Sequence, residues 1–127
     1  VDQAFLSSVL KELGDPQIII DDGSHHADHL SLTLEMLWPH LQDGGVYIIE
    51  DTHTSYWKEY GGGYLKNQTI VEFVKDAIDT IHQLYTRKKM PVRTEFLRDS
   101  LASITFFDSI IVLRKAKTTP PQRVSFE

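Results

Sequence analysis

The hydrophobic positions along the chain follow a helical period in some segments and form short continuous runs in others. Apolar residues recur three and four positions apart in three segments, which predicts amphipathic helices over residues 5–13, 27–41 and 69–85. Two continuous apolar runs predict buried strands over residues 17–21 and 46–49. A continuous run, unlike an alternating one, is typical of a parallel sheet that is covered on both faces.

The C-terminal third of the chain has a different pattern. Two apolar segments over 103–107 and 109–114 are joined by a tight turn and predict an antiparallel hairpin. Basic residues at 87–89 follow the third predicted helix, where cations suit the helix dipole. Residues 116–127 are polar and contain prolines, which predicts an extended or disordered tail after a single domain over 1–115.

The predicted order is helix, strand, helix, strand, helix and then two strands. Strand–helix–strand units form parallel sheets with right-handed crossovers, and the terminal hairpin adds an antiparallel edge. The pattern therefore predicts an α/β layered fold. A long loop over 51–67, with three glycines and several aromatic residues, separates the second strand from the third helix.

Composition narrows the classes of function. The chain has 127 residues, of which 41% are hydrophobic and 24% charged, and its net charge of −5 argues against a nucleic-acid or polybasic membrane binder. No apolar run approaches the length of a membrane span, and no signal peptide is visible. The absence of cysteine excludes disulfides and thiolate chemistry and suits a reducing cytoplasm.

Acidic residues follow both predicted parallel strands. Asp21 and Asp22 end the first strand, in the segment "IIIDDGSHH", and Glu50 and Asp51 end the second. Ligands of open α/β sheets bind outside the carboxyl ends of the strands, and neighbouring strands lie roughly 5 Å apart. Carboxylates that converge at that distance repel one another unless a hard divalent cation such as Mg²⁺ or Ca²⁺ binds them. His25 lies within reach of the same crevice and is the natural candidate for a general base.

Simpler interpretations exist for each of these residues. Asp-Gly is a turn signal, and Asp22 and Ser24 are good helix N-caps. Either acidic cluster alone is more often a turn or a cap than a site. Two clusters at equivalent strand ends, each followed by a histidine, are harder to explain by capping, and we favour a metal site. We take the remaining histidines outside the loop as structural, namely His26, His29 and His40.

The loop after the second strand offers candidate substrate contacts. His53 is either a neighbour of the metal, a substrate contact or a surface residue. Tyr56 and Trp57 lie in the same loop, followed by Tyr60 and Tyr64. These aromatic residues form either a lid over a flat or sugar-like substrate or simple anchors for the loop.

Two segments carry a resemblance to a known family. "IIIDDGSH" and "GGVYIIEDTHTSYW" resemble the class I S-adenosylmethionine-dependent O-methyltransferases of macrolide biosynthesis, the mycinamicin and macrocin type that methylates a sugar hydroxyl. The resemblance implies a Rossmann-like methyltransferase sheet. It also implies that Asp22, Glu50 and Asp51 bind Mg²⁺, that His25 is the general base, and that Asp2 lies near the adenine of the cofactor at the end of a strand over 1–3.

The resemblance implies direct methyl transfer to a hydroxyl of a sugar-containing small molecule. Mg²⁺ would lower the pKa of the acceptor hydroxyl, and His25 would take its proton as the oxygen attacks the methyl group of the sulfonium. The sequence departs from the family in one respect. It lacks the glycine-rich cofactor loop after the family's first strand, and the glycines at 61–63 do not replace it because they follow the second acidic cluster.

The chain therefore resembles the C-terminal half of a methyltransferase domain. Without the other half, the strand at 17–21 has an open apolar edge, so we expect a homo-oligomer or pairing with a second polypeptide. Two other functions stay open. One is a non-catalytic methyltransferase-like module for binding or oligomerisation, and the other is a metal-dependent hydrolase that uses the same acids on a water molecule.

Overall fold

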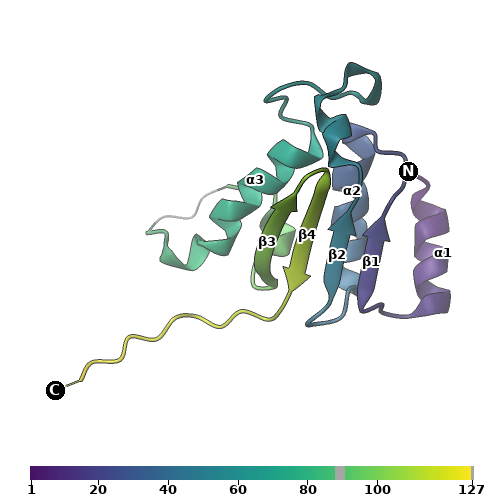
Figure 1. The fold of residues 1–127 in the computed structure, drawn as a ribbon. Coiled ribbons are helices and arrows are strands. Elements are labelled where there is room, and N and C mark those ends of the chain that lie inside the picture. Colours follow the sequence, from purple (N-terminus) through teal and green to yellow (C-terminus); the bar gives the residue numbers. More distant parts are fainter. Residues whose placement is uncertain (88–90, 127) are drawn as a thin grey trace.

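The protein is a mixed α/β sheet with helices packed on one face (Figure 1). The structure, a computed structural model, describes residues 1–87 and 91–126. Its long helices and its strands are α1 (Gln3–Leu13), β1 (Ile18–Asp21), α2 (Ala27–Leu37), β2 (Val46–Ile49), α3 (Ile70–Ile81), β3 (Leu101–Phe107) and β4 (Ile110–Lys115). The basic residues Lys88 and Lys89 and the last tail residue, Glu127, lie outside the described part of the chain.

The sheet has the strand order β1-β2-β4-β3. Strands β1 and β2 are parallel, with Ile18 opposite Val46 and Asp21 opposite Ile49. β4 runs antiparallel to both β2 and β3. The predicted α/β fold with two parallel strands and a terminal antiparallel hairpin is therefore confirmed. The parallel register also brings the carboxyl ends of β1 and β2 to the same edge of the sheet.

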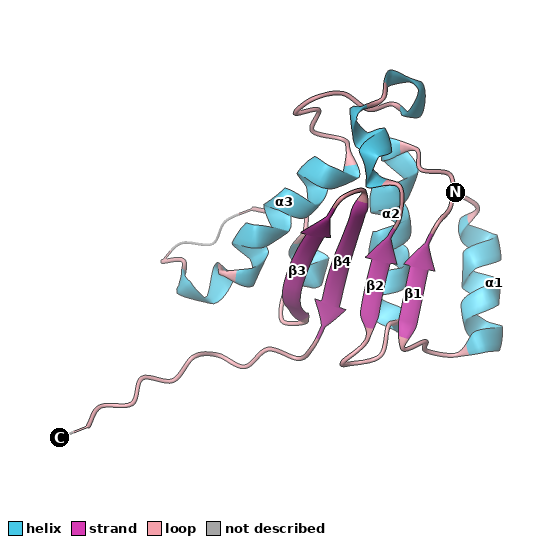
Figure 2. Ribbon diagram, viewed as in Figure 1, coloured by secondary structure: helices cyan, strands magenta, loops and turns pink. Residues whose placement is uncertain are grey.

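Helices α2 and α3 cover one face of the sheet and bury the core (Figure 2). Tyr47 and Ile49 of β2 contribute to this core. Further core residues come from the helices and from β4: Leu30, Leu34, Trp38, Ile70, Val74, Ala77, Ile111 and Leu113. At roughly 25 cal/mol per Å² of buried apolar surface, this burial is the main term that stabilises the domain.

Both of these helices are shorter than their hydrophobic pattern predicts. α2 ends at Leu37 and continues as a 3₁₀ turn over Trp38–His40, because Pro39 has no N–H for a helical hydrogen bond. α3 begins after Thr69, whose hydroxyl accepts a hydrogen bond from the Glu72 backbone N–H, and it ends at Ile81. Apolar residues continue at helical spacing beyond these helix ends. The hydrophobic pattern alone therefore does not show where the two helices end.

The expectation that β1 is covered on both faces is wrong for the described residues. Ile18 and Ile20 are 62% and 58% exposed, whereas Ile19 packs against the core and Asp21 is buried. Helix α1 lies beside β1 at the edge of the sheet, and none of its residues is fully buried (Figure 1). A continuous apolar run shows that a strand is suited to burial on both faces, and it does not show that both faces are covered.

Candidate active site

Two loops meet at the edge of the sheet where the parallel strands end. Asp22 follows β1, and Glu50 and Asp51 follow β2. The Glu50 backbone N–H donates to the Asp21 carbonyl at 3.1 Å and so continues the strand pairing into the loops. The acidic residues therefore converge because of strand register, as the sequence predicts.

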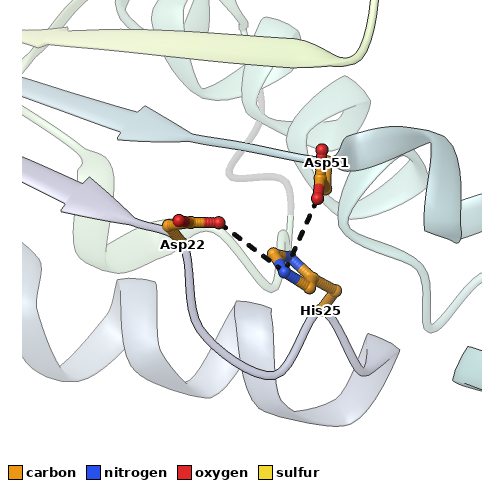
Figure 3. A group of neighbouring side chains, drawn as sticks. All are labelled: Asp22, His25 and Asp51. Atoms are coloured by element: carbon orange, nitrogen blue, oxygen red, sulfur yellow. Dashed lines mark ion pairs between the residues drawn. The ribbon is translucent and has the colours of Figure 1, made fainter.

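Three side chains from these loops come together (Figure 3). His25 Nε2 lies 3.7 Å from Asp22 Oδ1 and 3.7 Å from Asp51 Oδ2. One ligand atom of each residue lies within 4.8 Å of the other two. The imidazole side chain is 18% exposed, whereas the two carboxylates are 61% and 53% exposed. The group is therefore anchored through a mostly buried ring and open to solvent through its acids.

The group fits a divalent cation. Two carboxylate oxygens and an imidazole nitrogen are donors that Mg²⁺, Mn²⁺ and related ions accept. Two half-exposed carboxylates that meet at the same imidazole nitrogen also concentrate negative charge, which a cation offsets. Side-chain capping does not explain the acids. The N-cap of α2 is His26, and Asp51 is the N-cap of the 3₁₀ turn Thr52–Tyr56, but neither side chain makes a capping hydrogen bond.

Glu50, the third expected ligand, is not one of the three side chains that meet. It is half-buried and directly continues β2, while Asp51 turns into the left-handed region with φ 51°. Its role as a ligand stays a prediction.

Asp21 serves a different purpose from Asp22. Its carboxylate is buried and accepts a hydrogen bond from the Tyr47 hydroxyl at 3.0 Å. Burial raises the pKa of Asp21, and the hydrogen bonds from Tyr47 and from the Gly23 backbone partly oppose that rise. Burial, followed by the negative charge of Asp21, raises the pKa of Tyr47 far above its usual value. The pair therefore supports the β1 end from within the core.

Two residues of the acid–histidine group, which consists of Asp22, His25 and Asp51, have a strained backbone, as do Leu65, Asp99 and Ser109 elsewhere in the described chain. His25 and Asp51 have φ values of 54° and 51°, in the left-handed region that disfavours residues with a β-carbon. Each such residue costs about 1–2 kcal/mol, and strained residues of this kind cluster at functional sites. The Thr54 hydroxyl lies within hydrogen-bonding distance of both carbonyl oxygens, 3.1 Å from that of His25 and 2.9 Å from that of Asp51.

Thr54 and Tyr47 are residues whose roles sequence reasoning missed. A tyrosine inside an apolar strand was a usable signal, since a buried tyrosine hydroxyl usually has a partner. Thr54 gave no signal, because its partners are backbone carbonyls whose positions depend on the fold.

One of the expected substrate residues contacts the group, because His53 Nδ1 lies 4.0 Å from Asp51 Oδ1. His53 Nδ1 is 2.6 Å from Ser109 Oγ, and its ring meets Trp57 edge-on at 4.6 Å. Tyr56 and Trp57 are about half exposed, and Trp57 lines an open hollow with Glu59 and Tyr60. The loop thus presents aromatic surface to solvent, while His53 ties it to the β3–β4 turn.

Asp2, the expected adenine contact, is the N-cap of α1. Its Oδ1 accepts a hydrogen bond from the Phe5 backbone N–H at 2.9 Å. The prediction that residues 1–3 form the end of a strand is wrong for Gln3, because Gln3 is the first residue of α1. Asp2 also lines an open cleft of about 580 Å³ between α1 and β1, which reaches Asp22 and Ser24. Its contact with a cofactor stays a prediction.

Known proteins are similar to this chain in sequence and in fold. No protein-family model matches the chain. L-olivosyl-oleandolide 3-O-methyltransferase of Streptomyces antibioticus is 44% identical over 85 residues, which are 64% of this chain and 22% of that protein. A tetracenomycin-C rhamnosyl 3′-O-methyltransferase of Streptomyces olivaceus is 32% identical over 121 residues, which are 93% of this chain and 31% of that protein. Mycinamicin VI 2″-O-methyltransferase of Micromonospora griseorubida is 38% identical over 86 residues.

A solved structure agrees with these relatives. The MycE methyltransferase of the mycinamycin pathway, in complex with Mg and SAH, superposes with a TM-score of 0.83 at 27% identity, over 91% of this chain and 31% of that one. The sheet is therefore part of a Rossmann-like methyltransferase fold. Within that class, the chain is homologous to the O-methyltransferases of the mycinamicin and macrocin type. It spans 22–31% of the length of the relatives described above, consistent with the C-terminal half of the domain.

Proposed function

We propose that this chain is the metal- and base-bearing part of an S-adenosylmethionine- and Mg²⁺-dependent O-methyltransferase that acts on a sugar hydroxyl of a glycosylated natural product. The observation that carries the proposal is the convergence of Asp22, His25 and Asp51 at the carboxyl ends of β1 and β2. The relatives are named as methyltransferases of such sugars, and MycE was solved with Mg and SAH.

Asp22 and Asp51 would hold the cation, with Glu50 as a further ligand. When bound, the ion would lower the pKa of the acceptor hydroxyl. Both carboxylates also lie 3.7 Å from His25 Nε2, so the cation that they hold and the ring that takes the hydroxyl proton would stand side by side.

The two ring nitrogens of His25 have different surroundings. Nε2 faces the two acids, whereas Nδ1 is buried and has no hydrogen-bond partner among the described residues. A partner at Nδ1 would orient the ring for metal binding and for proton transfer alike. The base role of His25 therefore rests on its place beside the two acids that would hold the cation.

The aromatic loop would contact the acceptor sugar. Tyr56 and Trp57 are half exposed, and Trp57 meets edge-on the ring of His53, whose Nδ1 in turn lies 4.0 Å from Asp51 Oδ1. Aromatic faces suit the apolar C–H surface of a sugar ring, and the polar tips can hydrogen-bond its hydroxyls. A cytoplasmic location is part of the same proposal. No helix in the described ranges is long and apolar enough to cross a membrane.

The cofactor would need surface beyond the described residues. The chain matches under a third of the relatives' length, and β1 leaves Ile18 and Ile20 exposed at the sheet edge. The remainder of a methyltransferase sheet, or a second copy of the chain, would pair with this edge. The open edge is also the observation that favours the second candidate function, a non-catalytic module that associates through β1.

A calorimetric titration of S-adenosylhomocysteine in the presence of Mg²⁺ separates the two functions. The methyltransferase proposal predicts saturable binding when the chain is paired with the remainder of its domain, and weaker binding when Asp2 is replaced by Ala. A folded, fully paired protein that binds no S-adenosylhomocysteine would support the module instead.

A further inference from the structure

Two residues of the acid–histidine group share an unusual backbone state. His25 precedes α2 with φ 54°, and Asp51 follows β2 with φ 51°. A residue with a β-carbon stays in the left-handed region only where its surroundings hold it there. A contact that holds the backbone of these two residues, for example through their carbonyl groups, therefore also fixes the directions of their side chains.

The Thr54 hydroxyl contacts both of these residues. It lies 3.1 Å from the carbonyl oxygen of His25 and 2.9 Å from that of Asp51. A hydroxyl group has a single proton, so it shares that proton between the two acceptors. The contact with Asp51 is an ordinary one within a turn, at a separation of three residues. The contact with His25 crosses from the loop after β2 to the loop after β1.

Thr54 is itself fixed in place. It is 3% exposed and belongs to the 3₁₀ turn Thr52–Tyr56. The loop with glycines at 61–63 packs closely against this turn. A β-carbon on Gly62 would lie 2.5 Å from the Thr54 carbonyl oxygen. The Gly63 backbone N–H donates to the Ser55 carbonyl at 2.8 Å. The glycines that follow the second acidic cluster therefore leave room for the backbone that carries Thr54.

We propose that Thr54 is a positioning residue, whose hydroxyl links the two loops and sets the placement of His25 relative to Asp51. The inference builds on the proposed function, because that placement is what a cation and a proton acceptor need. Residues that orient ligands in this way are typically worth 10- to 100-fold in metal affinity.

The test compares three variants of the protein. Thr54→Val removes the hydroxyl and keeps the shape, and Thr54→Ser keeps the hydroxyl. Thr80→Val is the matched control, because Thr80 is equally buried and its hydroxyl bonds that of Thr94 at 2.6 Å, in α3 and away from the group. Backbone NMR chemical shifts of His25 and Asp51 report their φ angles, and Mn²⁺ titration followed by electron paramagnetic resonance reports cation affinity.

We expect Thr54→Val to shift the backbone signals of both His25 and Asp51 and to weaken Mn²⁺ binding about tenfold or more. Thr54→Ser should keep the wild-type shifts and stay within about twofold in affinity. Thr80→Val should lower the unfolding midpoint without changing either readout. This pattern separates positioning from a general contribution to stability, which Thr54→Val and Thr80→Val share.

Unchanged shifts at His25 and Asp51 in folded Thr54→Val would overturn the inference. If Thr54→Val does not fold, NMR of the Thr54 hydroxyl proton in the wild-type protein tests the inference instead. A Thr54 hydroxyl proton that is protected from exchange and shows a cross-peak to His25 supports the link, and rapid exchange with solvent contradicts it. Failure of the proposed function looks different, because wild-type protein would then bind no Mn²⁺ while the shift pattern at His25 and Asp51 still depended on the Thr54 hydroxyl.

Discussion

His25 Nε2 lies 3.7 Å from Asp51 Oδ2, although the two residues belong to different loops after different strands. The contact exists because β1 and β2 are parallel and in register, so both loops leave the same edge of the sheet. Asp22 Oδ1, in the loop after β1 that also carries His25, lies 3.7 Å from the same ring nitrogen. A proton acceptor beside two carboxylates that can hold a cation is the arrangement from which the proposed chemistry follows.

Replacing His25 by Ala should abolish methyl transfer and leave Mg²⁺ affinity nearly unchanged. Loss of a positioned general base typically costs 10²- to 10⁴-fold in rate, whereas the carboxylates that would hold the cation remain. Methyl transfer from labelled S-adenosylmethionine and calorimetry with Mg²⁺ measure the two quantities on the paired protein. Activity that survives the substitution would show that another group takes the proton.

Replacing Glu50 by Gln tests the ligand that the structure leaves outside the group of three. If Glu50 turns toward the cation when it binds, the variant should weaken Mg²⁺ binding by about tenfold, the lower end of the range for groups around a metal. Glu35→Gln, on α2, is a charge-matched control. Equal Mg²⁺ affinity in the Glu50 variant and the wild type would remove Glu50 from the ligand set.

The stability of the protein should depend on the titration of Asp21. Burial raises the pKa of this carboxyl above its usual 3.8, so the folded state binds its proton more readily than the unfolded state does. Stability from this group is therefore present at low pH and is lost as pH rises through the folded-state pKa. Asp21→Asn removes the titration. The free energy of unfolding of the wild type, relative to that of the variant, should fall as pH rises from below 3.8 toward neutrality in metal-free buffer. A difference that rises or stays flat would contradict this.

The edge of β1 should make the chain associate when it is alone. Ile18 and Ile20 are more than half exposed next to unpaired backbone groups. Sedimentation velocity at micromolar concentration should show species larger than a monomer, and the double substitution Ile18→Lys with Ile20→Lys should shift the distribution toward monomer. Phe107→Lys, at the opposite edge on β3, controls for added charge. A wild-type chain that sediments as a single monomer would refute the open-edge prediction.

Much of the fold follows from local chemistry. The apolar runs ending in Asp21 and Ile49 predict two buried strands, and their parallel pairing explains why Asp22 and Asp51 meet. The exposure of Ile18 was not predictable from the sequence, because an apolar run does not show whether another segment covers it. The left-handed turns at His25 and Asp51 were equally invisible, since neither residue type demands positive φ. Long-range packing sets both features.

The central claim is that Asp22 and Asp51 together bind one cation beside His25, and a Mg²⁺ titration of wild-type protein against Asp51→Asn by calorimetry tests it most directly. The account predicts one saturable site in the wild type and a loss of affinity of at least tenfold in the variant, with the fold retained by circular dichroism. Absence of Mg²⁺ binding in the wild type, or equal affinity in both proteins, would contradict it.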